Sequence, residues 1–395
     1  MKLPLSRALL AALGATALLA GAASAREEAG AGRSEAKVRV AGRPQVVFDW
    51  SREACGQAEE PDLPVRAFRN ASGQVQLLLP HYETYRLAGP SLNRLSSVCR
   101  PVMTSIEDPD PRRFQDRRWV ASPFTSDGSH VWALVHEEYQ GNRHPGRCPE
   151  RAYYPCWYNA ITLARSSDGG RSYHQPRPPR QLVAASSRRY RPGNGPSGVF
   201  APSNLVKRGG RFYALVRVRE PGFPSGDCLI RSGERRAPGS WRAWDGSSFA
   251  VAFDDPYRAH PAARARCRRI APDQISEMTE SLTYSTVLNR YLLAGIAGPP
   301  TRHPGKERGV YFSLSPDLIH WSARRLLLPA ATLHSYRCGQ SSPIAYPSLL
   351  DPSSRSRNFE TTGIHPFLYF TKFRYRGCRK TANRDLMRIR LSISR

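Results

Sequence analysis

The sequence predicts an all-β protein, and more specifically a five-bladed β-propeller with long loops and several disulfides. Three observations lead to this prediction. The chain of 395 residues contains 30 Gly and 34 Pro, which leaves few windows in which a long helix could form. Its hydrophobic content of 40% is enough to build a large core. A pattern of short strands and turns recurs five times along the chain. A two-sheet sandwich is the alternative architecture.

Each repeat has the pattern of a short strand, a polar turn, a strongly apolar strand and a third strand. The first two strands of the successive repeats are expected at 65–69 and 75–79, 119–124 and 131–139, 203–206 and 212–218, 282–287 and 291–297, and 346–350 and 366–373. The third strands are expected within 85–95, 160–173, 228–244, 309–321 and 386–393. Such units cannot bury both faces alone, whereas five units packed face to face around an axis can.

The remaining segments of the domain are assigned to ring closure and to loops. The alternating stretch 37–48 is expected to pair with the last unit as its outer strand. Long loops are expected at 148–156, 186–198 and 254–273, because the chain is longer than five four-stranded units require.

Residues 1–25 have the pattern of a secretory signal peptide. Two basic residues precede an apolar run at 8–22, and Ala-Ser-Ala follows as the cleavage site. Residues 26–36 are small and charged, so we expect a flexible leader before a propeller domain at 37–395. No other apolar run has the length of a membrane span, about 20 residues. The sequence thus predicts a soluble protein without a transmembrane segment, secreted or periplasmic.

The eight cysteines all lie after the predicted signal peptide, and an even number in an oxidising compartment predicts four disulfides. Sequence alone leaves many connectivities open, and we predict a local scheme. The predicted pairs are Cys55–Cys99, Cys148–Cys156, Cys228–Cys267 and Cys338–Cys378. No Cys-x-x-Cys pair is present, which argues against structural zinc.

The chain is strongly basic, with 59 Lys+Arg against 32 Asp+Glu and a net charge of +27. Only six of the basic residues are Lys, a bias that a GC-rich genome would produce without any functional reason. The functional interpretation is a surface that attracts polyanions, which for an exported protein means acidic glycans. No helix-turn-helix, zinc-finger or RNA-binding signature occurs, so no nucleic acid is predicted as a partner.

Two turns carry a resemblance to known families. The stretch 166–173, Ser-Ser-Asp-Gly-Gly-Arg-Ser-Tyr, resembles the Asp-box of sialidase-type propellers. The stretch 315–321, Ser-Pro-Asp-Leu-Ile-His-Trp, resembles a turn of five-bladed, furanosidase-type glycoside hydrolases of families 43 and 32. The resemblance implies that Asp168 and Asp317 are structural residues that cap their own turns.

The same resemblance points to catalytic carboxylates at the inner ends of the blades. Those hydrolases use an Asp before the first inner strand as base or nucleophile, an Asp on a middle blade for tuning, and a Glu on a later blade as acid. Asp62 and Glu280 stand at the first and last of these places, with Glu277 in reserve. Asn204 stands where the middle Asp is expected. Glu138 is the candidate for the missing carboxylate, because alternation along the strand points it and Glu137 to opposite faces.

Further residues are candidates for holding the substrate. Arg66 and Arg69 flank the first inner strand and could bind a carboxylate or sulfate group. His136 and Tyr139 lie beside Glu138, and the amide of Asn204 could orient a ligand. No metal site and no cofactor are predicted, since an axial Ca²⁺ finds no acidic loop to support it.

The function predicted from these residues is hydrolysis of a glycosidic bond by paired carboxylates in the axial funnel. The alternative is a non-catalytic propeller that binds an anionic cell-surface or extracellular glycan, which the missing middle Asp favours. The sequence does not decide whether the protein is an enzyme. It contains no nucleophile elbow, Walker loop, dinucleotide fingerprint or His-Glu-x-x-His motif, which disfavours esterases, nucleotidases, dehydrogenases and zinc proteases.

Overall fold

The computed structural model of the chain describes residues 36–395 except 150–151, 234–236, 259–265 and 300–306. The predicted signal peptide and all but the last residue of the predicted leader lie outside the described residues and stay predictions. The described part contains 24 strands and two four-residue α-helices, α1 (Trp50–Glu53) and α2 (Pro272–Ile275). Four 3₁₀ turns complete the elements: Pro111–Arg113, Gly141–Arg143, Tyr154–Cys156 and Pro238–Ser240. The prediction of an all-β fold is confirmed.

The described strands follow one another in five antiparallel units. The first unit contains β3 (Arg66–Arg69), β4 (Val75–Leu79), β5 (Glu83–Ser91) and β6 (Arg94–Thr104). The second contains β7 (Arg117–Thr125), β8 (Val131–Gln140), β9 (Trp157–Ser166) and β10 (Leu182–Ala185). The third contains β11 (Ser197–Phe200), β12 (Val206–Arg208), β13 (Arg211–Arg219), β14 (Gly226–Ser232), β15 (Arg242–Ala243) and β16 (Val251–Ala252).

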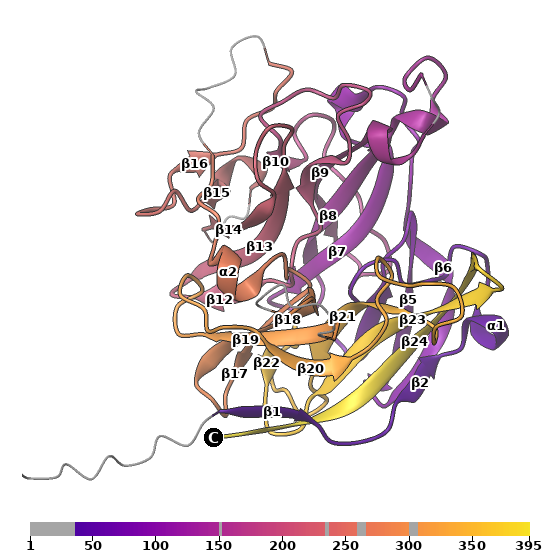
Figure 1. Cartoon of the computed structure of the whole chain (residues 1–395), viewed down its shortest axis with the longest axis vertical. Coiled ribbons are helices and arrows are strands. Elements are labelled where there is room, and N and C mark those ends of the chain that lie inside the picture. Colours follow the sequence, from indigo (N-terminus) through magenta and orange to yellow (C-terminus); the bar gives the residue numbers. More distant parts are fainter. Residues whose placement is uncertain (1–35, 150–151, 234–236, 259–265, 300–306) are drawn as a thin grey trace, which may run out of the picture. The chain divides into compact units, whose positions relative to one another are not determined.

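The last two units follow the same plan. The fourth contains β17 (Ser281–Ser285), β18 (Arg290–Ala297), β19 (Gly309–Ser315) and β20 (Arg325–Pro329), and β22 (Thr361–Thr362) pairs with β17 in parallel. The fifth contains β21 (Ile344–Leu350), β23 (Phe367–Arg376) and β24 (Arg379–Ser394). The first two strands of the chain, β1 (Lys37–Val40) and β2 (Gln45–Phe48), pair with β24, as predicted (Figure 1).

The units pack face to face in a closed ring, because five hydrophobic clusters each contain residues of two neighbouring units. Representative residues in the successive clusters are Phe68 with Ala133, Leu134 with Phe212, Leu229 with Leu293, Phe312 with Leu368, and Tyr369 with Leu77. The last cluster joins the fifth unit back to the first. Strands β4 and β8 are buried along almost their whole length, as expected for strands with a neighbour on each face. The fold is therefore the predicted β-propeller and not a two-sheet sandwich.

Two expected strands differ in the structure. The stretch 85–95 turns back on itself, so that β5 and β6 form a hairpin. Of the expected strand at 203–206, only Val206 lies in a strand, as the first residue of β12, while β11 lies upstream and begins at the end of the expected loop 186–198. Pro202 lacks the N–H that a continuous ladder requires, and the Ser203 hydroxyl accepts a hydrogen bond of 3.0 Å from the backbone N–H of Leu215. The extra strand β11 pairs in parallel with β9 and links the second and third units.

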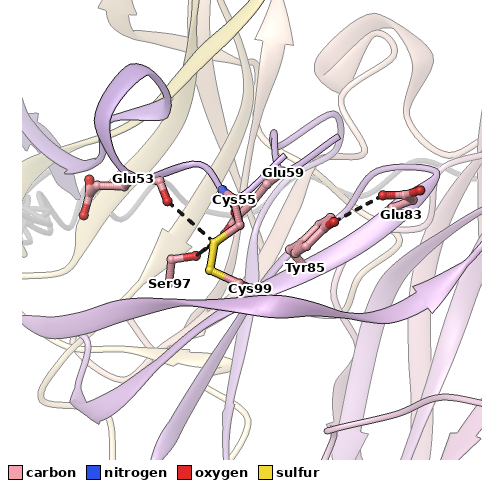
Figure 2. The surroundings of a disulfide bond; sticks show 7 residues. All are labelled: Glu53, Cys55, Glu59, Glu83, Tyr85, Ser97 and Cys99. Carbon is pink, nitrogen blue, oxygen red and sulfur yellow. Dashed lines mark hydrogen bonds between the residues drawn. A yellow bond between two sulfur atoms is a disulfide. The ribbon is translucent and has the colours of Figure 1, made fainter. Parts of the chain in front are cut away.

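All four predicted disulfides are present: Cys55–Cys99, Cys148–Cys156, Cys228–Cys267 and Cys338–Cys378. Figure 2 shows the first of these with Glu59 and Ser97 beside it. The Ser97 hydroxyl donates to the Glu59 carboxylate, whose second oxygen accepts a hydrogen bond of 2.6 Å from the backbone N–H of Cys55. The local pairing scheme is confirmed.

The two motif aspartates have the structural role that was expected. Asp168 Oδ1 accepts hydrogen bonds of 2.9 and 3.0 Å from the backbone N–H groups of Arg171 and Ser172. Asp317 Oδ1 accepts 2.9 and 2.8 Å bonds from those of Ile319 and His320. Burial opposes ionisation of both groups, but side-chain hydrogen bonds, from Ser172 and Ser166 to Asp168 and from His320 to Asp317, outweigh it together with these backbone bonds and lower each pKa to about 2. Within the described residues, no helix is long and apolar enough to cross a membrane.

Candidate functional site

A cavity of about 1410 Å³, which we call the axial cavity, is lined by residues from all five units. The first unit contributes the segment before β3, the second the end of β8, the third β11 and β13, the fourth the segment before β17, and the fifth β21 and β24. Asp62, Glu138 and Glu280, the three predicted carboxylates, all line it. The convergence of distant inner strands on one axis brings them together.

Asp62 is held by the fifth unit. Its Oδ1 atom accepts a hydrogen bond of 3.1 Å from the Tyr346 hydroxyl and a second, charge-assisted bond from Arg384 Nη1. His81 Nε2 lies 3.7 Å from its Oδ2 atom. Burial alone would raise the pKa of this carboxyl, but the charge of Arg384, with weaker contributions from other neighbours, outweighs burial and lowers the pKa below its usual value. Asp62 is therefore an ionised carboxylate at the cavity wall.

Glu60 and His81 form the layer behind Asp62. Arg384 Nε lies 2.9 Å from Glu60 Oε2, so one guanidinium contacts both carboxylates. Burial raises the pKa of Glu60 to about 8, while it lowers the pKa of His81 to about 4. Burial therefore favours the uncharged forms of Glu60 and His81, and Arg384 is the main counter-charge of Asp62.

Glu138 is fixed by three neighbours in the second unit. Its Oε1 atom lies 3.1 Å from His136 Nε2, and its Oε2 atom accepts bonds of 2.7 Å from Gln140 Nε2 and 3.2 Å from the Tyr153 hydroxyl. Glu137, the next residue of β8, is buried opposite Arg118 of β7 and does not line the cavity. The predicted alternation of the two glutamates is what the structure shows.

Glu280 lies in the segment that leads into β17. Its two carboxyl oxygens each accept a 3.1 Å hydrogen bond, Oε2 from the backbone N–H of Thr279 and Oε1 from that of Ile296. Burial raises the pKa of this carboxyl, although Arg217 opposes the rise. Glu280 is thus set apart from Asp62, because its surroundings favour the protonated form.

The sequence analysis missed an ionic cluster beside Glu280. Arg217 Nη1 lies 3.5 Å from the reserve candidate Glu277, and Arg217 Nε lies 3.6 Å from the buried carboxylate of Asp227. Burial raises the pKa of Asp227 to about 8, and the charges of Glu280 and Glu277 add to the rise. Asp227 on β14 is paired with Arg217 on β13, and no local sequence motif predicts this register.

Asn204 holds the backbone of the site and does not line the cavity. Its Oδ1 atom accepts a hydrogen bond of 2.7 Å from the backbone N–H of Leu282, directly after Glu280 and Ser281. The amide therefore anchors the start of β17 at the place where the family pattern has a carboxylate. Asn204 positions the strand that follows Glu280, and its predicted contact with a ligand stays a prediction.

Three other predicted binding residues also lie outside the cavity lining. Arg66 is buried and donates to the backbone carbonyl of Glu280 and to Ser348 Oγ. Arg69 donates to two backbone carbonyls of the segment 354–356. The Tyr139 hydroxyl donates a 2.9 Å bond to the carbonyl of Pro109. Their polar groups hold neighbouring segments together, so their placement gives no support to substrate binding, whereas His136 does line the cavity.

Four basic side chains of the cavity have no carboxylate within ion-pair distance among the described residues. They are Arg219, Arg308, His334 and Lys380. Burial is the main cause that lowers the pKa of His334, and the nearby positive charges of Arg217, Lys380 and Arg219 lower it further. The cavity therefore carries positive charge without an ion-pair partner on Arg219, Arg308 and Lys380, while Asp273 is a lining acid that also has no ion-pair partner among the described residues. No three His, Cys, Asp or Glu side chains in the described part of the chain are placed to hold a metal ion.

The structure is similar to several solved glycoside hydrolases at low sequence identity. The catalytic domain of Coprinopsis cinerea GH62 α-L-arabinofuranosidase has a TM-score of 0.49 and 9% identity, with 89% of this chain and 97% of that chain covered. A Cellvibrio cellulosa α-L-arabinanase has a TM-score of 0.46 and 9% identity, with 83% of this chain and 91% of that chain covered. A thermostable family-43 glycoside hydrolase has a TM-score of 0.43 and 8% identity, with 85% of this chain and 94% of that chain covered.

Comparison by sequence finds no relative of this kind. No protein-family profile matches the chain, and no curated protein matches it. The resemblance to five-bladed propeller glycoside hydrolases that the sequence predicts is thus found again at the level of structure.

Proposed function

We propose that the axial cavity binds an acidic glycan and hydrolyses one of its glycosidic bonds. The observation that carries the proposal is the contrast between two carboxyl groups in one cavity. The surroundings of Asp62 lower its pKa, whereas those of Glu280 raise its pKa. Glycoside hydrolysis requires this pair, one carboxyl that donates a proton and one that is ionised.

In this mechanism Glu280 donates its proton to the glycosidic oxygen as the bond to the leaving sugar breaks. Asp62 stands as the ionised partner that activates water or attacks the sugar carbon. The elements of water end on the two products, and Glu280 recovers a proton before the next cycle. Glu138, locked by His136, Gln140 and Tyr153, serves as a fixed acceptor for a sugar hydroxyl near the reacting carbon.

Aromatic side chains of the cavity support a carbohydrate ligand. Tyr153 and Trp157 are stacked with ring centroids 5.0 Å apart, and Phe200 meets Trp157 edge-on at 5.4 Å. Tyr154, beside them, is 58% exposed. Flat apolar faces of this kind fit the C–H face of a sugar ring, while the polar edges of the ring reach the carboxylates.

The unpaired cations define the charge of the glycan. Arg219 and Lys380 have no carboxylate partner among the described residues, and a uronate or sulfate group on the sugar would supply one. A neutral glycan would leave both charges without a counter-charge. The four disulfides support the expectation that the protein works in an oxidising compartment, either secreted or periplasmic.

Binding without hydrolysis is the second candidate function, and one observation favours it. Asp62 Oδ1 already accepts bonds from both Tyr346 and Arg384, which restrains the carboxylate, and no third carboxylate occupies the place of Asn204.

The test is a panel of polysaccharides incubated with the native chain. Polygalacturonate, alginate and heparin represent acidic glycans, while arabinan and xylan are neutral controls. Released reducing ends report hydrolysis, and affinity electrophoresis reports binding. The proposal expects hydrolysis confined to acidic members. Binding of an acidic glycan without product from any member would establish the second candidate instead.

A further inference from the structure

A second cavity, of about 670 Å³, lies beside the axial cavity. We call it the arginine pocket. Its basic lining residues are Arg188, Arg189, Arg191, Arg266 and Arg269. The disulfide Cys228–Cys267 and the ring of Phe223 also contribute to the wall.

Strand β13 separates the two cavities. Arg217 and Arg219 line the axial cavity, whereas Val218 and Glu220, the residues that alternate with them, line the arginine pocket. This is the expected result of side chains pointing to opposite faces of an extended strand. The segment that follows β10 also reaches both cavities, because Asn194 lines the arginine pocket and Pro196 lines the axial cavity. Strand β13 and the segment after β10 therefore each contribute residues to both cavities.

The arginine pocket has an excess of positive charge, because five arginines of the described chain line it against two acidic residues, Glu220 and Asp254. The buried carboxylate of Glu220 is occupied by the second unit: Oε1 accepts 2.8 Å bonds from the Ser186 hydroxyl and the backbone N–H of Ser187. Arg266 is the one arginine of the pocket near it, at 3.4 Å. Within the described residues, Arg188, Arg191 and Arg269 have no carboxylate within ion-pair distance.

An aromatic ring holds two of the guanidinium groups in place. Phe223 is 40% exposed, and the guanidinium carbon of Arg266 lies 3.1 Å from its ring centroid. That of Arg188 lies 5.7 Å from the same centroid. Two like charges gathered on one ring repel each other, and an anion bound between them would relieve the repulsion.

We propose that the arginine pocket binds carboxylate or sulfate groups of an acidic glycan chain whose neighbouring sugars occupy the axial cavity. The inference rests on the proposed function for the identity of the ligand as a glycan. Arginine is suited to this task, because its planar guanidinium binds such groups through two parallel hydrogen bonds. The pocket would then make the protein prefer long acidic chains over short ones.

The test measures the affinity of the full chain for size-defined oligosaccharides by calorimetry. Oligogalacturonides carry carboxylate alone and heparin fragments add sulfate, so the two series distinguish the anionic groups. Each series includes a trisaccharide and a dodecasaccharide. The pocket variant replaces Arg188, Arg191 and Arg269 with Ala. The matched control replaces Arg39, Arg43 and Arg94, which are exposed and line neither cavity, so that the net charge changes equally.

The expected result is a loss of about tenfold or more in dodecasaccharide affinity for the pocket variant, with trisaccharide affinity unchanged. The control should lose less than about twofold, the part due to general charge. Equal losses in the two variants, or an equal loss for short and long chains, would overturn the inference while leaving the proposed function intact. Failure of the native chain to bind either trisaccharide would instead count against the proposed function. Thermal melting confirms that both variants fold.

Discussion

The hydroxyl of Tyr346 donates a 3.1 Å hydrogen bond to Asp62, 284 residues away in the chain. Tyr346 has a φ of 58°, a left-handed conformation that is unfavourable for a bulky residue. The pairing of β21 with β23 shifts register between Ala345 and Ser348, on either side of it. The strained bulge therefore turns the tyrosine toward the carboxylate of the first unit, as is common for backbone strain at functional sites.

Removing the Tyr346 hydroxyl should shift the acid limb of the pH profile of kcat/KM. The hydrogen bond from Tyr346 lowers the pKa of Asp62, and the ionised form of Asp62 is the active one. Tyr346→Phe should therefore raise that pKa, so that kcat/KM falls at a higher pH on the acid side, while the basic limb set by Glu280 stays in place. Tyr284→Phe, at the distant end of β17, is the control. Movement of both limbs together would contradict these assignments.

Arg219 should contribute to binding the acidic substrate and little to the chemical step. Arg219→Ala removes one of the unpaired cations of the axial cavity, so KM for an acidic oligosaccharide should rise by about tenfold with kcat nearly unchanged. The matched control is Arg211→Ala, an exposed arginine on the same strand that lines neither cavity. The two kinetic parameters are measured at low and physiological salt. An equal change in both variants would assign the effect to net charge.

Asp227 should make the protein less stable as the pH rises. Its pKa is about 8 in the folded chain and near 3.8 when unfolded, so the folded state holds a proton that the unfolded state releases. The stability linked to this proton is complete below about pH 3.8 and is lost as the pH rises to about 8. Asp227→Asn removes the dependence. As the pH rises through that window, the free energy of unfolding of the variant minus that of the native chain should therefore increase by up to about 1.4 kcal/mol per pH unit. If the difference in free energy of unfolding between the variant and the native chain is the same at all pH values, the assignment is refuted.

The disulfide Cys148–Cys156 should matter more for function than for the fold. It closes the loop that carries Tyr153 and Tyr154, both of which line the axial cavity. Replacing both cysteines with Ala should cost about 2–3 kcal/mol of stability, as for a short closed loop. Glycan affinity should fall as well, because the Tyr153 hydroxyl no longer holds Glu138. The same change at Cys55 and Cys99, which lie outside the cavity lining, is the comparison. Equal loss of glycan affinity in both double variants would contradict the local role of the loop.

Much of the fold and part of the site could be predicted from the sequence. The order of the five units and all four disulfides follow from local patterns, because each blade folds from contiguous chain. The pairing of β1 and β2 with β24 joins the two ends of the described chain and follows from the need to close the ring. Asp62, Glu138 and Glu280 could be found because each lies at or beside an inner strand. The roles of these three carboxylates remain proposals.

The partners of the carboxylates could not be predicted. Arg384 and Tyr346 reach Asp62 from 322 and 284 residues away, through contacts that exist only once the ring is closed. Asp227 meets Arg217 because of the register of β13 and β14. The same limit explains Arg66, whose position beside the first inner strand suggested a ligand, although its guanidinium donates to the backbone of Glu280.

The hydrolysis of an acidic oligosaccharide by Glu280→Gln, measured beside its binding, tests the central claim most directly. The amide keeps the shape of the side chain and loses the transferable proton, so kcat should fall by about 100-fold or more while affinity and melting temperature stay unchanged. Glu307→Gln, an exposed residue outside the cavity lining, should retain full turnover. Undiminished hydrolysis by Glu280→Gln, or a native chain that binds the glycan and never cleaves it, would contradict the hydrolytic mechanism.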